Sequence, residues 1–157
     1  MAEVASTARA VQQHWLSHGL RVFQVGRSEL ASLSRSISDG LPEEYDEFLR
    51  IAGLPDNEDA AGFRFWLPTE VTPTNQVLHN AGYEISFSDP SMIIADYMQE
   101  SWWYCLWVGG TFRGQVSLVL GREDHLNPVP TFATFGEFLQ AYLADDPQLY
   151  PPAPNSQ

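Results

Sequence analysis

The stretch Trp102 to Val108 contains seven apolar or aromatic residues and no charge, and it constrains the fold more than any other segment. It is far too short for a membrane-spanning helix, which needs about 20 apolar residues, and its continuous apolar character suits a buried strand. Gly109-Gly110 follows directly and supplies the positive φ angles that a two-residue hairpin loop requires. Val116 to Leu120 then offers a returning strand. The pattern predicts an antiparallel hairpin in the core of the protein.

Further strands are predicted on the N-terminal side of this hairpin. Phe63 to Leu67 and Met92 to Ala95 are short apolar runs. Glu84 to Ser88 alternates between polar and apolar residues and ends at Asp89-Pro90, which is a turn signal. Thr69 to His79, around Pro73, is expected to be an irregular or short helical connection. The central part of the chain therefore predicts an antiparallel meander of about four to six strands.

Helical periodicity flanks this central part. Val4, Ala8, Val11 and Trp15 recur at spacings of three and four, which predicts an amphipathic helix that ends before Gly19. A shorter helix is indicated by Leu30, Leu33 and Ile37, with a stop at Asp39-Gly40.

Two helices have clear end signals. Leu41-Pro42 begins a segment whose first turn is acidic, as favoured by the helix dipole, and Gly53 closes it. Thr134 to Glu137 is a capping box that begins a C-terminal helix, and Asp145-Asp146-Pro147 ends that helix. We therefore expect an α+β fold, with a twisted antiparallel sheet, helices packed on one side and the other face more open.

The length of 157 residues suits a single core. We expect one domain over residues 1–150, with an N-terminal helical extension over 1–26, and a flexible proline-rich tail over 151–157. No apolar segment near the N-terminus resembles a signal peptide. The single cysteine excludes an internal disulfide, so we expect a reducing, cytoplasmic location.

The charge balance is strongly acidic. Twenty acidic residues face eight basic ones, which gives a net charge of −12, and all eight are arginines. Such a surface repels nucleic-acid phosphates, and it accelerates association with a basic partner. A high net charge also keeps a small protein soluble without any partner. Composition by itself therefore leaves both interpretations open, a basic partner and solubility.

Three segments of the sequence resemble the SUKH superfamily, which contains bacterial toxin-immunity proteins and fungal regulators of cell-wall synthesis. They are the helix that begins at Leu41-Pro42, the pair of strands Ile93 to Met98 and Ser101 to Tyr104, and the helix Thr134 to Leu139. The residues that match the family pattern or its core are Leu41, Pro42, Tyr45, Phe48, Leu49, Trp103, Phe135, Phe138 and Leu139.

This resemblance implies a non-enzymatic immunity protein that binds and neutralises a cognate toxin domain. The acidic surface suggests that the toxin domain is basic, and a basic nuclease is the suggested type. The alternative within the same superfamily is an intracellular regulatory scaffold or adaptor protein. Neither function involves a cofactor, a metal, a membrane or direct contact with nucleic acid. The family often has an asparagine-glycine pair just after the first conserved helix, and the corresponding stretch here is Ile51-Ala52-Gly53-Leu54-Pro55.

We expect partner binding to involve acidic residues around an aromatic strand. In a strand, Trp102, Tyr104 and Leu106 face one way and Trp103, Cys105 and Trp107 the other. Either both faces belong to the core, or one face forms a groove for a partner. The candidate partner-binding residues are Asp56, Glu58, Asp59, Asp89, Asp96, Glu100, Trp102 and Tyr104.

Catalytic and metal sites are weakly indicated. His14 and His18 lie four apart, as in a zinc pair, but no third ligand and no intervening glutamate accompany them. Cys105 with His79 or His125 would make a nucleophile only if the thiol were accessible, and its apolar surroundings favour a buried, inert thiol. The sequence therefore favours a binding protein over an enzyme.

Overall fold

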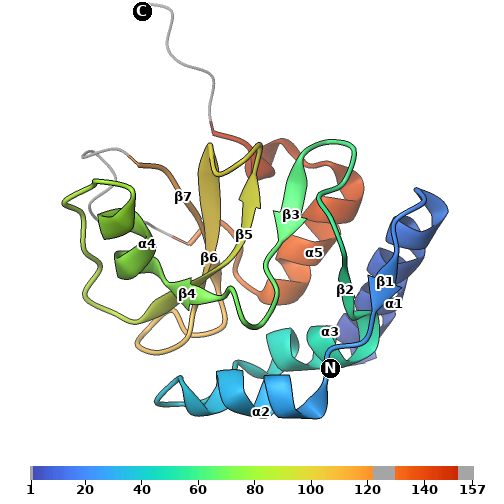
Figure 1. The fold of residues 1–157 in the computed structure, drawn as a ribbon, viewed down its shortest axis with the longest axis horizontal. Helices are drawn as coiled ribbons and strands as arrows, with labels where there is room; N and C mark the ends of the chain where they lie inside the picture. Colours follow the sequence, from blue (N-terminus) through green and yellow to red (C-terminus); the bar gives the residue numbers. More distant parts are fainter. Residues whose placement is uncertain (1, 122–129, 152–157) are drawn as a thin grey trace, which may run out of the picture.

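The computed structural model describes residues 2–121 and 130–151, which form an α+β fold around a five-stranded antiparallel sheet (Figure 1). Residues 122–129, which include His125, and the tail beyond 151 lie outside the described residues. The elements are, in chain order, α1 (Ala2–Ser17), β1 (Val22–Phe23), α2 (Arg27–Arg35), α3 (Glu43–Ala52), β2 (Leu54–Pro55), β3 (Phe63–Phe65), β4 (Thr72–Pro73), α4 (Thr74–Asn80), β5 (Ser91–Tyr97), β6 (Trp102–Trp107), β7 (Val116–Val119), α5 (Phe135–Ala144) and the short 3₁₀ helix η1 (Pro147–Leu149).

Strand β5 organises the sheet. Along one edge it pairs with β6, from Ser91 opposite Trp107 to Tyr97 opposite Trp102. Its other edge is shared by β3, which pairs with residues 95–97, and β4, which pairs with residues 92–93. β7 follows β6 at the far edge, and every pairing is antiparallel. The predicted α+β class and antiparallel sheet are confirmed.

Four helices and one sheet face form the larger core. Helix α1 contacts both α3 and α5, and its Trp15 is fully buried against Phe48 and Phe65. The Trp15 indole N–H also donates to the hydroxyl of Tyr142 on α5 over 3.0 Å. Although the sequence set residues 1–26 apart as an extension, the inner face of α1 belongs to this core.

The opposite sheet face is also filled, so the expected open face is not observed. Helix α4 and the segment after it place Leu78, Ile85 and Phe87 over the second face of the sheet. There they cover Trp103 and Trp107 of β6, both at most 5% exposed. The alternation predicted for β6 is confirmed. Both of its faces serve core packing, because aromatic side chains of this size gain most free energy when water is excluded from them.

The connection between β6 and β7 differs from the predicted two-residue loop. The loop spans residues 108–115 and is closed by hydrogen bonds from Gly114 N–H to Trp107 O and from Trp107 N–H to Gln115 O. A two-residue turn of the predicted type needs a positive φ at both glycines. Here Gly110 has a φ of +76° while Gly109 does not enter the positive region, and the second such residue is Gly114 at +89°.

The predicted strand Glu84 to Ser88 is wrong, although its alternation is real. Ile85 and Phe87 are buried while Glu84 and Ser86 are exposed, but the segment belongs to no strand. The side chain of Asn75 takes the place of a neighbouring strand, since it accepts from Phe87 N–H over 2.8 Å and donates to Phe87 O over 3.0 Å. The alternation of buried and exposed side chains thus arises here without the backbone hydrogen bonds of a paired strand.

Several predicted helix ends are confirmed. Gly53 follows α3 with a φ of +68°. At the start of α5 the Thr134 hydroxyl accepts from Glu137 N–H over 3.0 Å, and the Glu137 carboxylate accepts from Ala133 N–H. None of the helices in residues 2–121 and 130–151 combines the length and apolar character needed to cross a membrane.

Candidate protein-interaction surface

The loop between β2 and β3 carries two exposed carboxylates, on Asp56 and Glu58, as expected for partner-binding residues. The third acid of this loop, Asp59, has a structural role instead. Its carboxylate accepts from the N–H groups of Ala61 and Phe63, each over 2.9 Å, and from the Tyr142 hydroxyl over 2.6 Å. Asp59 therefore shapes the loop, and Asp56 and Glu58 are the two acids that this loop presents to solvent.

Asp96 is a correction to the predicted acidic rim. It is 1% exposed on β5, and its carboxylate accepts hydrogen bonds from Arg64, from the Trp66 indole over 2.6 Å and from Glu100 N–H over 3.1 Å. A second ion pair joins Arg64 to Glu70. These bonds compensate for the burial of the charge, and they leave Asp96 unable to reach a partner.

Tyr104 is a second correction. It is fully buried, its ring stacks on Phe63 at 4.9 Å, and its hydroxyl donates to Leu149 O over 2.6 Å. Trp102 is half-buried, with its indole stacked on Tyr97 at 4.6 Å and its N–H donating to the Tyr104 hydroxyl. The aromatic strand thus provides the core, and only an edge of Trp102 remains at the surface.

Glu100 is exposed and lies within the turn between β5 and β6. Its carboxylate accepts from the Trp103 indole over 2.9 Å. Asp89, the last of the predicted partner residues, lies in the approach to β5 and lines a cleft that the sequence did not predict.

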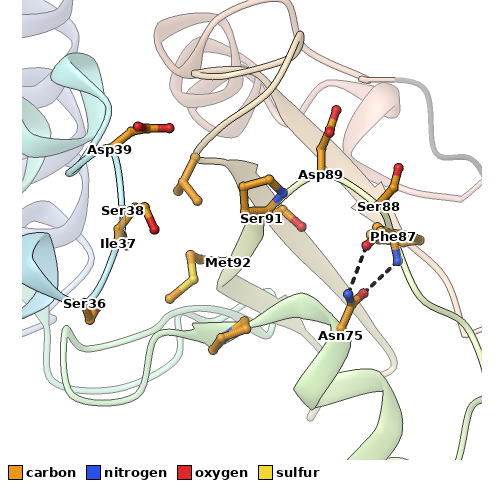
Figure 2. Close-up of a pocket in the computed structure, with 13 residues that line it drawn as sticks. Ser36, Ile37, Ser38, Asp39, Asn75, Phe87, Ser88, Asp89, Ser91 and Met92 are labelled. Atoms are coloured by element: carbon orange, nitrogen blue, oxygen red, sulfur yellow. Dashed lines mark hydrogen bonds between the residues drawn. The ribbon is translucent and has the colours of Figure 1, made fainter.

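This cleft has a volume of about 370 Å³ and lies between the turn after α2 and the entrance to β5 (Figure 2). Asp39 and Ser38 stand on one side of it, and Ser88 and Asp89 stand on the other. Its size is at the lower end of the range for ligand pockets, which is roughly 300–1,000 Å³. The cleft therefore suits a single side chain or a small molecule.

Part of the cleft lining is apolar. Ile37, Met92 and Val108 line it, and each is at most 8% exposed. Two glycines lie close to the carboxylates at its rim. A Cβ on Gly109 would lie 3.3 Å from the carboxylate of Asp39, and a Cβ on Gly110 would lie 2.5 Å from the carboxylate of Asp89. Asp39 and Asp89 therefore approach neighbouring residues of the same loop.

Hydrogen bonds made by side chains fix the walls of the cleft. Asn75 holds Phe87 as described above, and Ser91 donates to the Thr74 hydroxyl over 2.7 Å. On the other side, Arg113 donates to the backbone oxygens of Asp39, Gly40 and Val108. The cleft is thus formed in the absence of a partner.

A smaller hollow of about 220 Å³ gathers His14, His18, Asp59, Tyr142 and Asp145. The two imidazole rings lie 4.4 Å apart, and partial burial together with the neighbouring His18 lowers the pKa of His14. The carboxylate of Asp59 binds Tyr142, and that of Asp145 accepts from Tyr150. Within the described part of the chain, no three His, Cys, Asp or Glu side chains are arranged to hold a metal ion.

Cys105 is fully buried in the second core, and its burial raises the pKa of the thiol to about 12. His79, its predicted partner within the described residues, is exposed and contacts the Ser86 hydroxyl instead. The arrangement needed for a cysteine nucleophile is therefore not formed by these two residues.

The sequence contained only a weak indication of the cleft. Asp39-Gly40 and Asp89-Pro90 were both identified as stop or turn signals, yet fifty positions separate the two aspartates. Comparison of the chain with family models, curated proteins and solved structures gives no match. The cleft and its acidic rim therefore have to be interpreted from their own chemistry.

Proposed function

We propose that this chain is a binding protein, an immunity protein of the SUKH type that neutralises a basic toxin domain by stoichiometric association. The sequence resemblance suggests the class, and the surplus of negative charge carries the physical argument. Twenty acidic residues stand against eight arginines. Within the described residues, Arg50 and Arg64 pair with only three carboxylates, those of Asp46, Glu70 and Asp96.

Most of the acidic charge is thus not neutralised by ion pairs within the described residues. A negative surface attracts a positively charged protein over several ångströms and raises the rate of encounter. Burial of Tyr104 and Trp103 in the two cores means that polar and acidic contacts, rather than a broad aromatic patch, face the partner. We therefore expect binding whose association rate depends strongly on salt.

The decisive experiment uses the toxin domain that this proposal expects to be encoded beside the gene for this chain. Titration of the purified chain into a fixed amount of that domain, with the toxin's own activity as the readout, is expected to show loss of activity at one equivalent. Calorimetry measures the same stoichiometry independently. Full toxin activity at a large excess of this chain, with no heat of binding, would exclude the proposed function.

Charge-reversal variants test the electrostatic argument. Asp56→Lys with Glu58→Lys changes two exposed acids, and it is expected to lower the association rate by about tenfold at low salt. Asp59 is left intact because it holds the loop together. Glu47→Lys with Glu84→Lys carries the same total charge change at two positions outside this loop and serves as the control for net charge. Equal rates for the two double variants would mean that net charge acts without a local contribution from this loop.

A further inference from the structure

We infer that the cleft between α2 and β5 receives one basic side chain of the protein partner, with its charged group between Asp39 and Asp89. This inference rests on the proposed function and specifies its contact site. Asp39 and Asp89 come from distant parts of the chain and are both among the residues that line the cleft (Figure 2). Neither belongs to an ion pair within the residues that the structure describes.

The lining of the cleft matches the two parts of a basic side chain. Ile37, Met92 and Val108 offer an apolar surface for the methylene groups. Asp39 and Asp89 offer acceptors for a guanidinium or ammonium group at the rim. Lysine and arginine bury their stems along apolar surfaces and keep the charged end near water and acceptors in this way.

The charge of the rim favours a single cation. Arg113 lies beside the cleft, but it directs its N–H groups to backbone oxygens of Asp39, Gly40 and Val108. Two carboxylates and one guanidinium leave one net negative charge. One incoming basic group neutralises this charge, and a second would meet Arg113.

The fixed walls add to the expected affinity. Because Asn75 and Arg113 already hold the segments on either side, little conformational entropy is lost when the cleft is filled. The small side chains at its mouth, Ser36, Ser38 and Ser88, leave the entrance accessible. A protruding side chain therefore enters without rearrangement of the fold.

The test combines a double variant with two probes. Asp39→Asn with Asp89→Asn removes both charges and keeps the shape of the side chains. Glu47→Gln with Glu84→Gln removes one half-buried and one exposed charge elsewhere. Calorimetry with the neighbouring-gene toxin domain is expected to show a Kd at least about tenfold weaker for the cleft variant and nearly unchanged for the control. Thermal unfolding of each variant verifies that the fold is retained.

The second probe is independent of any toxin. Nα-acetyl-arginine amide, Nα-acetyl-lysine amide and neutral Nα-acetyl-norleucine amide are titrated into the wild-type chain, and the backbone amide signals are followed by NMR. The two basic amides are expected to shift the signals of Met92, Val108 and neighbouring residues, whereas the norleucine amide and the Asp39→Asn/Asp89→Asn variant show no saturable shift. The arginine and lysine arms identify which basic group the cleft prefers.

The outcomes separate the two proposals. Equal toxin affinity of wild type and cleft variant overturns the cleft assignment and leaves the immunity function standing. Absence of toxin binding by the wild type overturns the function, and the amide titration then decides about the cleft alone. Shifts that are equal for basic and neutral amides, or that occur away from the cleft, overturn the inference.

Discussion

The indole N–H of Trp66 donates to the carboxylate of Asp96 over 2.6 Å and thereby ties the end of β3 to β5. Asp96 also accepts from Glu100 N–H, across a turn in which Met98, Gln99 and Glu100 all have positive φ angles. Left-handed backbone costs a non-glycine residue about 1–2 kcal/mol. One buried carboxylate therefore neutralises Arg64, satisfies Trp66 and stabilises a strained turn.

Replacement of Asp96 is expected to be strongly destabilising. Asp96→Ala leaves the half-buried Arg64 and the Trp66 indole without this acceptor, and it should lower the free energy of unfolding by about 3 kcal/mol. The matched control is Asp46→Ala, which breaks an exposed i,i+4 pair with Arg50 and should cost less than about 1 kcal/mol. Urea unfolding of both variants measures the difference. Equal losses would show that burial does not set the strength of these pairs.

The place of Asp96 also shows why the sequence misassigned it. The apolar run Met92 to Ala95 taken alone predicted a strand that ends before Asp96, whereas the segment Ile93 to Met98 of the family resemblance includes Asp96. In the structure β5 continues to Tyr97. Nothing local indicates that the carboxylate meets Arg64 and Trp66, which lie about thirty positions earlier in the chain. The role of Asp96 is therefore set by contacts with residues far away in the sequence.

Local signals were predicted more successfully. The cap at Thr134 and the stop at Gly53 depend on residues within a few positions, and both are present. The alternation within β6 was also correct, because it follows from strand geometry alone. The cleft was missed because Asp39 and Asp89, which are far apart in the sequence, are brought to its rim only by the fold. The filled second face of the sheet was missed because the residues that cover it, on α4 and at Phe87, are not part of the sheet.

Removal of the Tyr45 hydroxyl is expected to stabilise the protein. Its oxygen is the one buried side-chain polar atom without a hydrogen-bond partner in residues 4–121 and 130–151, and burial raises its pKa. A buried, unpaired polar group costs about 1–3 kcal/mol, so Tyr45→Phe should raise the free energy of unfolding by about 1 kcal/mol. Tyr104→Phe makes the same chemical change where the hydroxyl donates to Leu149 O, and it should destabilise.

Chemical denaturation of the Tyr45→Phe and Tyr104→Phe variants supplies the comparison. Changes of opposite sign are expected. A loss of stability in Tyr45→Phe as large as that in Tyr104→Phe would mean that the Tyr45 hydroxyl has an acceptor or a bound water in solution.

Cys105 is expected to be unreactive in the folded protein. Its pKa is raised to about 12 by burial, so almost no thiolate exists in mildly alkaline buffer, and the side chain is inaccessible. A chromogenic disulfide reagent should therefore modify it only as fast as the protein opens, and completely within seconds in denaturant. The Cys105→Ala variant, which lacks the thiol, measures the background reaction of the reagent. Fast, stoichiometric reaction without denaturant would show that the second core opens readily.

Gly53 is expected to tolerate no side chain. It has a φ of +68°, and a Cβ there would lie 2.3 Å from the backbone oxygen of Phe23 on β1. Gly53→Ala must therefore strain the backbone and also push β1 away from β2, with an expected loss above about 2 kcal/mol. Gly82→Ala separates the two effects, because Gly82 has a φ of +92° and no atom within 4 Å of the added carbon. Only backbone strain, about 1–2 kcal/mol, should appear there. Equal unfolding free energies for the two variants would show that β1 moves away from the added carbon without loss of stability. The pairing of β1 with β2 would then contribute little to stability.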